Sequence, residues 1–479
     1  MRGQTGPFVT NYEDTAAFGS LCDAVAYRRL IAVTGSGVSV GLPNADSELP
    51  SLPTWYSVLI RLRERFAVRL SAAMPELDAL LSSHLRDSAY LIEAATLISQ
   101  SVGAAAFRRA VVELTTPPRG SFSALHGLIE ELEPLGIITF NYDMGHENAY
   151  ESMRSRSSTA LKRAIYSDEA RLRELLAGDF ETRFLLKAHG SIVRPHTVVL
   201  DRESYREIMA RQLGYRAFVH HVLTRFNALI VGFGLSDPDF DDMLQTFEEN
   251  FGGSVRDHVY IWKRGQRDDE EARAIVLRRR YGLACIFVDS FEEVRSLIGD
   301  AGRHLGPRLR QTIADALHRV ADAREYSEQR RAAHMALSEL SRTGAKTAAA
   351  AFRANAVDPS AAPSVRAEAA YCLGKIRPTV AGTAEFLLSL VGPEADPEIA
   401  TFALAALLQL EPPVDRRIVA WTESAKALMP ICNDIDRNVA RIGTRGGRPR
   451  ARKYLDALLA RWNAMHADAE RPGQGLSKP

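Results

Sequence analysis

Short apolar segments alternate with amphipathic segments over about the first 300 residues of the chain. A continuous run of about five apolar residues predicts a strand buried on both faces, and apolar residues three and four apart predict a helix with one buried side. The predicted strands are Leu30–Thr34, Gly136–Phe140, Phe184–Ala188, Ala228–Val231, Val259–Trp262 and Ala284–Val288. The predicted helices include Thr54–Arg69, Tyr90–Val102, Phe107–Thr115, Ser121–Glu133 and Phe291–Ile298. Because the two patterns alternate, we expect an α/β domain with a mostly parallel sheet and helices on both faces.

The pattern changes near residue 306, after which the chain is rich in Ala, Leu and Arg and has no strand-like run. Three segments resemble one another at intervals of about 36 and 34 residues: Gln329–Leu340, Val365–Ile376 and Ile399–Leu410. The middle one resembles the inner helix of HEAT repeats, whose helix pairs stack into a solenoid. A non-repetitive helical bundle is the alternative. We therefore expect two domains, an α/β domain over residues 1–305 and a helical domain over residues 306–479.

Charge and hydropathy argue against several classes of partner. The chain has 60 Lys and Arg against 59 Asp and Glu, so its net charge of +1 gives no overall attraction to nucleic acid or to an anionic membrane. No apolar run reaches the roughly 18–20 residues that a membrane span needs, and the N-terminus lacks the pattern of a secretory signal. The basic run Arg445–Lys453 is interpreted as a solvated loop before a helix, and a nucleic-acid contact there is the alternative.

The four cysteines are far apart in the chain and never form a CxxC pair: Cys22, Cys285, Cys372 and Cys432. This distribution argues against a disulfide framework and against a cysteine-based zinc module, and it fits a reducing cytoplasm. His146, His220 and His221 also lack the spacing of metal ligands, and they are expected to be surface or packing residues. We expect a cytoplasmic protein with no metal site.

A glycine-rich turn, Gly35–Gly41, directly follows the first predicted strand. It departs from the dinucleotide fingerprint GxGxxG because its third glycine comes one place late, and it lacks the Lys-Ser or Lys-Thr of a P-loop. It matches the GxSxG elbow of serine hydrolases around Ser39, with Asp143 and His189 following in the order of that triad. However, Leu42-Pro43 is a poor start for the helix that follows such an elbow.

Three further strands end in polar or glycine-rich turns. Asn141-Tyr142-Asp143 follows the second predicted strand, His189-Gly190-Ser191 the third, and Gly232–Asp237 the fourth. Ligands of open α/β sheets bind at the carboxyl ends of the strands, so these turns are expected to converge on one crevice.

This set of motifs resembles the sirtuin-like family, specifically its bacterial branch that hydrolyses NAD in antiphage defence. The resemblance covers about residues 20–300 and rests on five segments: Gly35–Ser39, Leu52–Trp55, Thr139–Asp143, Lys187–Ser191 and Gly232–Asp237. It implies a Rossmann-like sheet. The chain departs from the family at Ser36, in the additional residues Leu42–Leu52, and at Gly145-His146 after the segment Thr139–Asp143. It also lacks the four-cysteine zinc module of the family's lysine deacylases.

The resemblance implies a role for each motif. Asn141 would position the ribose hydroxyls or the attacking water, His189 would act as the base, and Asp143 would hold the nicotinamide amide. The remaining residues expected to bind NAD are Gly35, Ser36, Gly37, Ser39, Thr54, Trp55, Gly232, Gly234 and Ser236. NAD is the expected substrate, and no other cofactor is expected. Each assignment has a structural alternative: Asn141 and Asp143 could cap the next helix, Ser236 and Asp237 could cap another, and His189 could be a core residue.

These features predict an NAD glycohydrolase that depletes NAD in antiphage defence when triggered. A non-catalytic sensor of NAD or ADP-ribose is the first alternative, and a serine hydrolase using Ser39 is the second. Residues 306–479 are expected to form a homo-oligomer or to bind a protein partner or phage-derived trigger. The segment Leu42–Leu52 is the expected movable cover over the cofactor.

Overall fold

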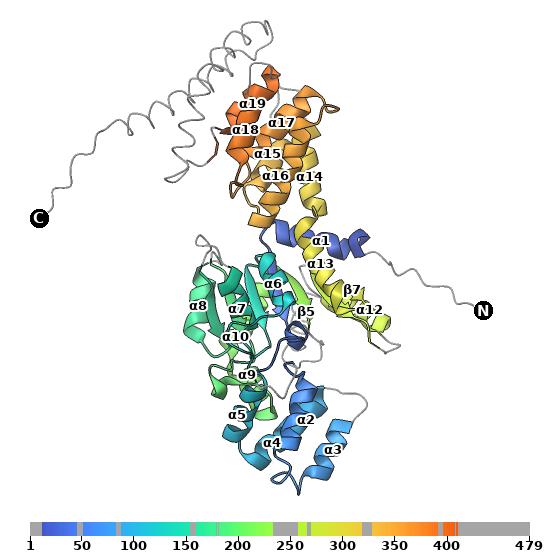
Figure 1. The fold of residues 1–479 in the computed structure, drawn as a ribbon, viewed down its shortest axis with the longest axis vertical. Helices are drawn as coiled ribbons and strands as arrows, with labels where there is room; N and C mark the ends of the chain where they lie inside the picture. The colour runs from blue at the N-terminus through green and yellow to red at the C-terminus, as the bar shows by residue number, and fades with distance from the viewer. Residues whose placement is uncertain are drawn as a thin grey trace, which may run out of the picture. The chain divides into compact units, whose positions relative to one another are not determined.

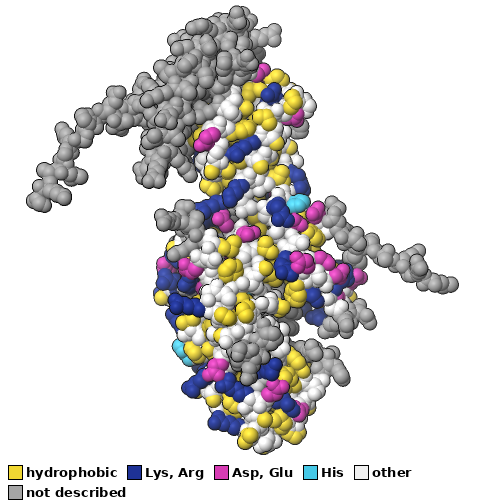
Figure 2. Space-filling model, in the orientation of Figure 1, with side chains coloured by type: hydrophobic (Ala, Val, Ile, Leu, Met, Phe, Trp, Pro, Cys, Tyr) yellow, Lys and Arg dark blue, Asp and Glu magenta, His cyan; other side chains and the backbone are white. Residues whose placement is uncertain are grey.

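The chain forms two compact units, Met1–His304 and Leu305–Pro479 (Figure 1). The computed structural model describes residues 12–45, 51–82, 88–153, 160–178, 180, 182–232, 257–265, 270–318, 328–390, 396–407 and 409–410. None of the helices described there is both long and apolar enough to cross a lipid bilayer. On the face seen in Figure 2, basic and acidic side chains are interspersed over the described surface, as the near-zero net charge suggests.

Unit 1 is built on a seven-stranded sheet in which all paired strands are parallel, in the order β3-β4-β2-β1-β5-β6-β7. The strands are β1 (Leu30–Thr34), β2 (Gly136–Thr139), β3 (Lys162–Ile165), β4 (Phe184–Lys187), β5 (Asn227–Val231), β6 (His258–Lys263) and β7 (Leu283–Val288). The predicted Rossmann-like α/β fold is confirmed. Strands β2, β3 and β4 lie on one side of β1 in the sheet, and β5, β6 and β7 lie on its other side. The strand order therefore reverses at β1, and ligands of such sheets bind at the point of reversal.

Alternate residues of β1 point into two separate cores. Ile31 and Val33 face one core, and Leu30 and Ala32 face the other. All five residues of β1 are buried, which explains why this strand is a continuous apolar run in the sequence. The sheet is therefore covered by helices on both faces.

The described helices of unit 1 separate into those that cover the sheet and those inserted between β1 and β2. The covering helices are α1 (Ala16–Ala26), α6 (Ala124–Glu131), α7 (Gly145–Met153), α8 (Glu169–Ala177), α9 (Arg202–Arg211), α10 (Leu213–Arg225), α12 (Glu270–Tyr281) and α13 (Phe291–Arg303). The inserted helices are α2 (Trp55–Arg65), α3 (Met74–Ser82), α4 (Ser88–Val102) and α5 (Ala104–Leu114). Figure 1 shows these four grouped together, and they share a third core that includes Leu62, Ile98 and Phe107.

β3 is the strand that the sequence pattern does not predict. It lies at the edge of the sheet, pairs only with β4 among the described strands, and begins with Lys162 and Arg163, which are not buried. Only Ala164 and Ile165 are buried, so the strand has no continuous apolar run. An edge strand of this kind needs few apolar residues because one of its sides remains open to water.

Unit 2 consists of helices in its described part: α14 (Pro307–His318), α15 (Glu328–Leu337), α16 (Arg342–Val357), α17 (Pro363–Leu373), α18 (Thr383–Ser389) and α19 (Pro397–Leu407). Helix α17 packs against both α16 and α19. The contact with α19 is close because a Cβ on Gly374 would lie 2.6 Å from the Ala406 backbone. Helices α15, α17 and α19 coincide with the three similar segments, and their HEAT-like nature stays a prediction. The basic run Arg445–Lys453 lies outside the described residues.

Candidate functional site

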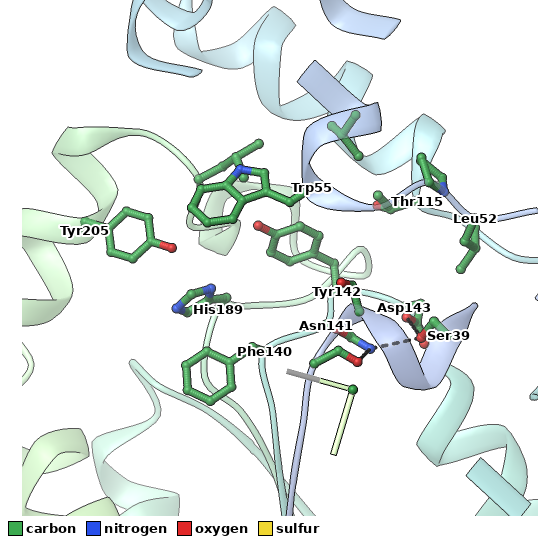
Figure 3. A pocket seen from close by; sticks show the side chains of 16 residues that line it. Ser39, Leu52, Trp55, Thr115, Phe140, Asn141, Tyr142, Asp143, His189 and Tyr205 are labelled. Atoms are coloured by element: carbon green, nitrogen blue, oxygen red, sulfur yellow. Dashed lines mark hydrogen bonds between the residues drawn. The ribbon is translucent and has the colours of Figure 1, made fainter. Parts of the chain in front are cut away.

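A cavity opens at the carboxyl ends of β1, β2, β4 and β5, with about 890 Å³ of space that is partly open to solvent (Figure 3). Predicted site residues that line it are Gly35, Ser36, Ser39, Trp55, Asn141, Asp143, His189 and Gly232. Thr54 is not among the lining residues, and its hydroxyl accepts a hydrogen bond from the Ser57 backbone at the start of α2. Gly234 and Ser236 lie outside the described residues. The structure thus brings together residues from four turns that are far apart in the sequence.

Further residues, most of them apolar or aromatic, complete the wall of the cavity. Leu52, Pro53, Phe140 and Tyr142 belong to the motifs but had no expected role, whereas Val58, Thr115, Leu200 and Tyr205 lie outside the motifs. Tyr142 is fixed because its hydroxyl donates to the Val199 carbonyl at 2.6 Å. Figure 3 shows Trp55, Tyr205 and Tyr142 around the position of His189. Val58, Thr115, Leu200 and Tyr205 belong to no sequence motif, because residues of several types could occupy such a wall if their shape is suitable.

The glycine turn after β1 is held against the end of β5 through backbone atoms. The Gly37 N–H donates to the Gly232 carbonyl at 2.8 Å, and the Gly35 N–H donates to the Val231 carbonyl at 3.2 Å. A Cβ on Gly37 would lie 2.7 Å from the Gly232 Cα, and Gly232 itself has a positive φ of 66°. Both positions therefore need glycine, one for space and the other for its backbone conformation.

Gly37→Ala is expected to lower the free energy of unfolding by about 1–3 kcal/mol, because the added methyl group must push two backbone segments apart. The matched control is Gly214→Ala, where the nearest atom to the new Cβ is 3.8 Å away and the change should stay within about 1 kcal/mol. Urea unfolding of both variants measures the difference. Equal stabilities would contradict the proposed backbone contact.

The side chains of Ser39, Asn141 and Asp143 form one buried hydrogen-bonded group. The Asn141 amide donates to the Gly35 carbonyl at 3.0 Å and to the Ser39 hydroxyl at 2.9 Å. The Ser39 hydroxyl donates to Asp143 Oδ2 at 2.7 Å, and Asp143 Oδ1 accepts from the Gly145 N–H at 2.8 Å. Asp143 therefore caps the start of α7 while its other oxygen faces the glycine turn, whereas Asn141 links β2 to that turn.

This arrangement does not favour the serine-hydrolase alternative. In the described part of the chain, the hydroxyl of Ser39 contacts an amide and a carboxylate, and no imidazole hydrogen-bonds to it. A nucleophilic serine needs a neighbouring base that accepts its proton, which is usually a histidine. His189 lines the same cavity but does not form this pair.

His189 lies in the turn after β4 and is only 3% exposed. Its ring packs edge-on against Phe140 at 4.8 Å and against Tyr205 at 5.4 Å between ring centroids. The next residue, Gly190, has a φ of 84°, and a Cβ there would lie 2.1 Å from the Thr197 carbonyl oxygen. The imidazole is thus held at the wall of the cavity by two aromatic rings and a turn that only glycine fits.

A buried lysine supports the turn that carries Asn141 and Asp143. Lys187, the last residue of β4, is 3% exposed, and its ammonium donates to the backbone carbonyls of Tyr142, at 3.1 Å, and Asp143. The same ammonium pairs with the Glu147 carboxylate on α7 at 3.2 Å. Lys187 belongs to a predicted motif, but no role was expected for it. A lysine at the end of an otherwise apolar strand is the signal that could have indicated one.

The expectation that His146 is a surface or packing residue holds only for packing. His146 is 3% exposed, its ring lies 4.5 Å from that of His126, and its Nε2 is 2.9 Å from the Thr34 hydroxyl. Gly145 makes this docking of α7 feasible, because a Cβ there would lie 2.4 Å from the His126 ring. Burial lowers the pKa of His126 to about 4, and burial also lowers the pKa of His146.

Because the folded pKa of His126 is below that of an unfolded histidine, about 6.5, the unfolded chain binds a proton first as the pH falls. Stability is therefore full above about pH 6.5 and decreases down to about pH 4, by up to about 3 kcal/mol from this residue. Urea unfolding at several pH values measures the slope. His126→Gln should flatten it, and glutamine suits the capping box that His126 forms with Ser123. An unchanged slope in this variant would contradict the assignment.

The segment Leu42–Leu52 is anchored at its described ends. Leu42 is fully buried and its carbonyl accepts from the Leu52 N–H at 2.8 Å, while the Asn44 amide donates to the Leu114 carbonyl at 2.7 Å. Leu52 lines the cavity, and residues 46–50 lie outside the described part. That this segment moves as a cover stays a prediction.

Comparison with known proteins supports the sirtuin-like resemblance for part of the chain. No curated protein matches it. One family model, described as a SIR2-like domain, matches residues 135–286, about a third of the chain. This range contains the Asn141–Asp143 and His189 turns and the β5 end, whereas the glycine turn after β1 and all of unit 2 lie outside it. The comparison and the Rossmann-like sheet together support a sirtuin-like family for unit 1, through the similarity of residues 135–286 to a SIR2-like domain.

Proposed function

We propose that unit 1 hydrolyses NAD to nicotinamide and ADP-ribose. The observation that carries this proposal is the convergence of Asn141, Asp143 and His189 on a cavity beside the Gly35–Ser39 turn. In NAD the nicotinamide ring carries a positive charge, and cleavage of its bond to ribose releases it as neutral nicotinamide. The reaction needs a shielded site, fixed dipoles and an aligned nucleophile more than it needs a strong acid.

The residues of the cavity can divide this work. The glycine turn suits the diphosphate, because glycine lets an anion approach the backbone closely. The N–H groups of Gly35 and Gly37 bond to the end of β5, so other N–H groups of the turn would donate to the diphosphate. Asn141 is fixed by two hydrogen bonds and can orient a ribose hydroxyl or a water molecule. His189 can accept the proton of that nucleophile, and the unperturbed pKa of histidine suits such a base near neutral pH.

The aromatic wall supports a cationic ring as the group bound near His189. Trp55, Phe140, Tyr142 and Tyr205 line this part of the cavity, and aromatic faces attract cations such as the nicotinamide ring of NAD. The Asp143 carboxylate lines the same cavity beside Ser39 and adds a negative charge to it (Figure 3). Once the bond to ribose is broken, nicotinamide is neutral, so the aromatic side chains and the carboxylate attract it less strongly and it can leave.

Release of nicotinamide tests the proposal and separates it from the alternative of a non-catalytic sensor. Full-length protein is incubated with NAD, alone and with lysate of phage-infected cells, and nicotinamide and ADP-ribose are quantified by chromatography. Turnover that is absent from an Asn141→Ala sample supports hydrolysis. Saturable NAD binding with no product under either condition would favour the sensor and overturn the proposal.

We further propose that the reaction depletes NAD in antiphage defence and that unit 2 controls it by self-assembly or by binding a trigger. An intracellular enzyme that consumes NAD harms its own cell unless it is held inactive, and helical arrays commonly offer binding surfaces. The test compares the full-length protein with residues 1–305 in solution mass and in NAD turnover. Identical values with every trigger tested, from a folded fragment, would remove the regulatory role.

A further inference from the structure

Unit 2 contains a buried cluster of three side chains that are common metal ligands. His334 lies on α15, and Glu368 and Cys372 lie on α17. Their exposed fractions are 5%, 0% and 0%. Glu368 and Cys372 are four residues apart and therefore lie on one face of α17, and His334 reaches that face from a helix more than 30 residues earlier.

The ligand atoms are spaced as in a metal site. His334 Nε2 lies 3.0 Å from Glu368 Oε1, and Cys372 Sγ lies 3.7 Å from the nitrogen and 3.9 Å from the oxygen. A single point therefore lies about 2.1 Å from all three atoms, and zinc bonds to nitrogen, oxygen and sulfur are about 2.0–2.3 Å long. The three atoms are therefore close enough to bind one ion, and a water molecule would supply the fourth ligand, as in zinc sites with three protein ligands.

We propose that His334, Glu368 and Cys372 bind one zinc ion that links α15 to α17. The mixture of imidazole, carboxylate and thiolate suits zinc, whereas Mg²⁺ and Ca²⁺ prefer oxygen ligands alone. On binding, the thiol proton of Cys372 passes to solvent, and the proton of the His334–Glu368 hydrogen bond moves to His334 Nδ1 or to solvent, so that Nε2 is free to hold the ion. The thiolate and the Glu368 carboxylate then balance the two positive charges of zinc, which leaves the buried cluster neutral.

The metal-free alternative is an imidazole–carboxylate hydrogen bond with a thiol beside it. This arrangement also gives the Glu368 carboxylate a hydrogen-bond partner. The two alternatives differ in whether the purified protein contains zinc. The sequence expectation of no metal site rested on CxxC pairs and histidine spacing. A ligand set divided between two helices escapes such a search, because only the packing of α15 on α17 brings its members together.

A zinc ion here would act on the stability of unit 2. Helix α17 packs against α16 and α19, so a bond from α17 to α15 would connect a further helix to this group. A metal that binds the folded chain and not the unfolded one raises the free energy of unfolding by an amount that grows with the logarithm of its affinity. The inference concerns unit 2 alone and does not depend on NAD hydrolysis by unit 1.

Metal analysis of the full-length protein, purified without a histidine tag, tests the proposal. We expect about one zinc per chain, removed by a strong chelator with a fall in Tm of several degrees and restored by ZnCl₂ but not by MgCl₂. Cys372→Ser and Glu368→Gln should each lower the zinc content well below one per chain. Cys285→Ser, which changes a cysteine of unit 1 that is not part of the cluster, is the matched control and should retain the metal.

Measurements on the wild-type protein alone can overturn the proposal. The test therefore remains decisive even if a variant fails to fold. Wild-type protein is analysed as purified and again after incubation with ZnCl₂ and desalting. If it holds no zinc in either case and its Tm is unchanged, the cluster is a metal-free hydrogen-bonded core. Zinc retained equally by Cys372→Ser and Glu368→Gln would place the ion elsewhere. A different metal bound at about one ion per chain would contradict the assignment of the ion as zinc.

Discussion

Replacing Asn141 or His189 with alanine is expected to lower NAD cleavage by about 10²–10⁴-fold, because each removes a positioned group from the reacting centre. The Asn141 amide is fixed by the Gly35 carbonyl and the Ser39 hydroxyl, and the His189 ring is fixed between Phe140 and Tyr205. Water that enters the vacated space will not be oriented in the same way. Initial rates of nicotinamide release, measured at saturating NAD, give the size of the loss.

Matched controls come from the same residue types outside the cavity. Asn148 on α7 donates to the Ser121 carbonyl at 2.8 Å, and His196 lies exposed in a short turn, so Asn148→Ala and His196→Ala should keep most of the turnover. Circular dichroism and urea unfolding verify that all four variants fold. Folded Asn141→Ala or His189→Ala protein with near-normal turnover would remove that residue from the proposed mechanism.

The second large effect is expected at Lys187. Replacing it with methionine leaves the Glu147 carboxylate buried without its cation and removes the donor from the Tyr142 and Asp143 carbonyls. Breaking a buried ion pair from one side typically costs about 3–5 kcal/mol. This loss is comparable to the total stability of many domains, which is about 5–15 kcal/mol.

Lys162→Met provides the comparison for Lys187→Met. Lys162 also pairs with a glutamate, Glu174, at 2.8 Å, but the Glu174 side chain is 47% exposed. Exposed ion pairs contribute about 0–1 kcal/mol, so urea unfolding should show a small change for Lys162 and a large one for Lys187. The double variant Lys187→Met, Glu147→Gln should recover part of the lost stability. Similar losses for both lysines would contradict the role assigned to burial.

The turns that form the cavity were predictable from the sequence because each directly follows an apolar run. β1, β2 and β4 are wholly buried strands, and the polar residues after them, such as Asn141 and His189, must lie at one edge of a parallel sheet. The edge strand β3 was not predictable in this way, because half of its residues are polar or exposed.

Contacts between side chains that are far apart in the sequence could not be predicted from the sequence either. Lys187 and Glu147 pair across β4 and α7, and His126 packs against Gly145 only because α6 and α7 lie side by side. Their residue types suggest exposure or catalysis, since charged residues are almost never fully buried unless they are paired. The pairing that makes their burial favourable is visible only in three dimensions.

Trp55 packs against two cores, that of the sheet and that of the helices inserted between β1 and β2. Its indole also lines the cavity, so this residue reports on its contents as well as on its packing. The chain has three other tryptophans, Trp262, Trp421 and Trp462. Replacing those three with phenylalanine leaves a single tryptophan, whose fluorescence then follows the arrival of a ligand in the cavity without any added dye.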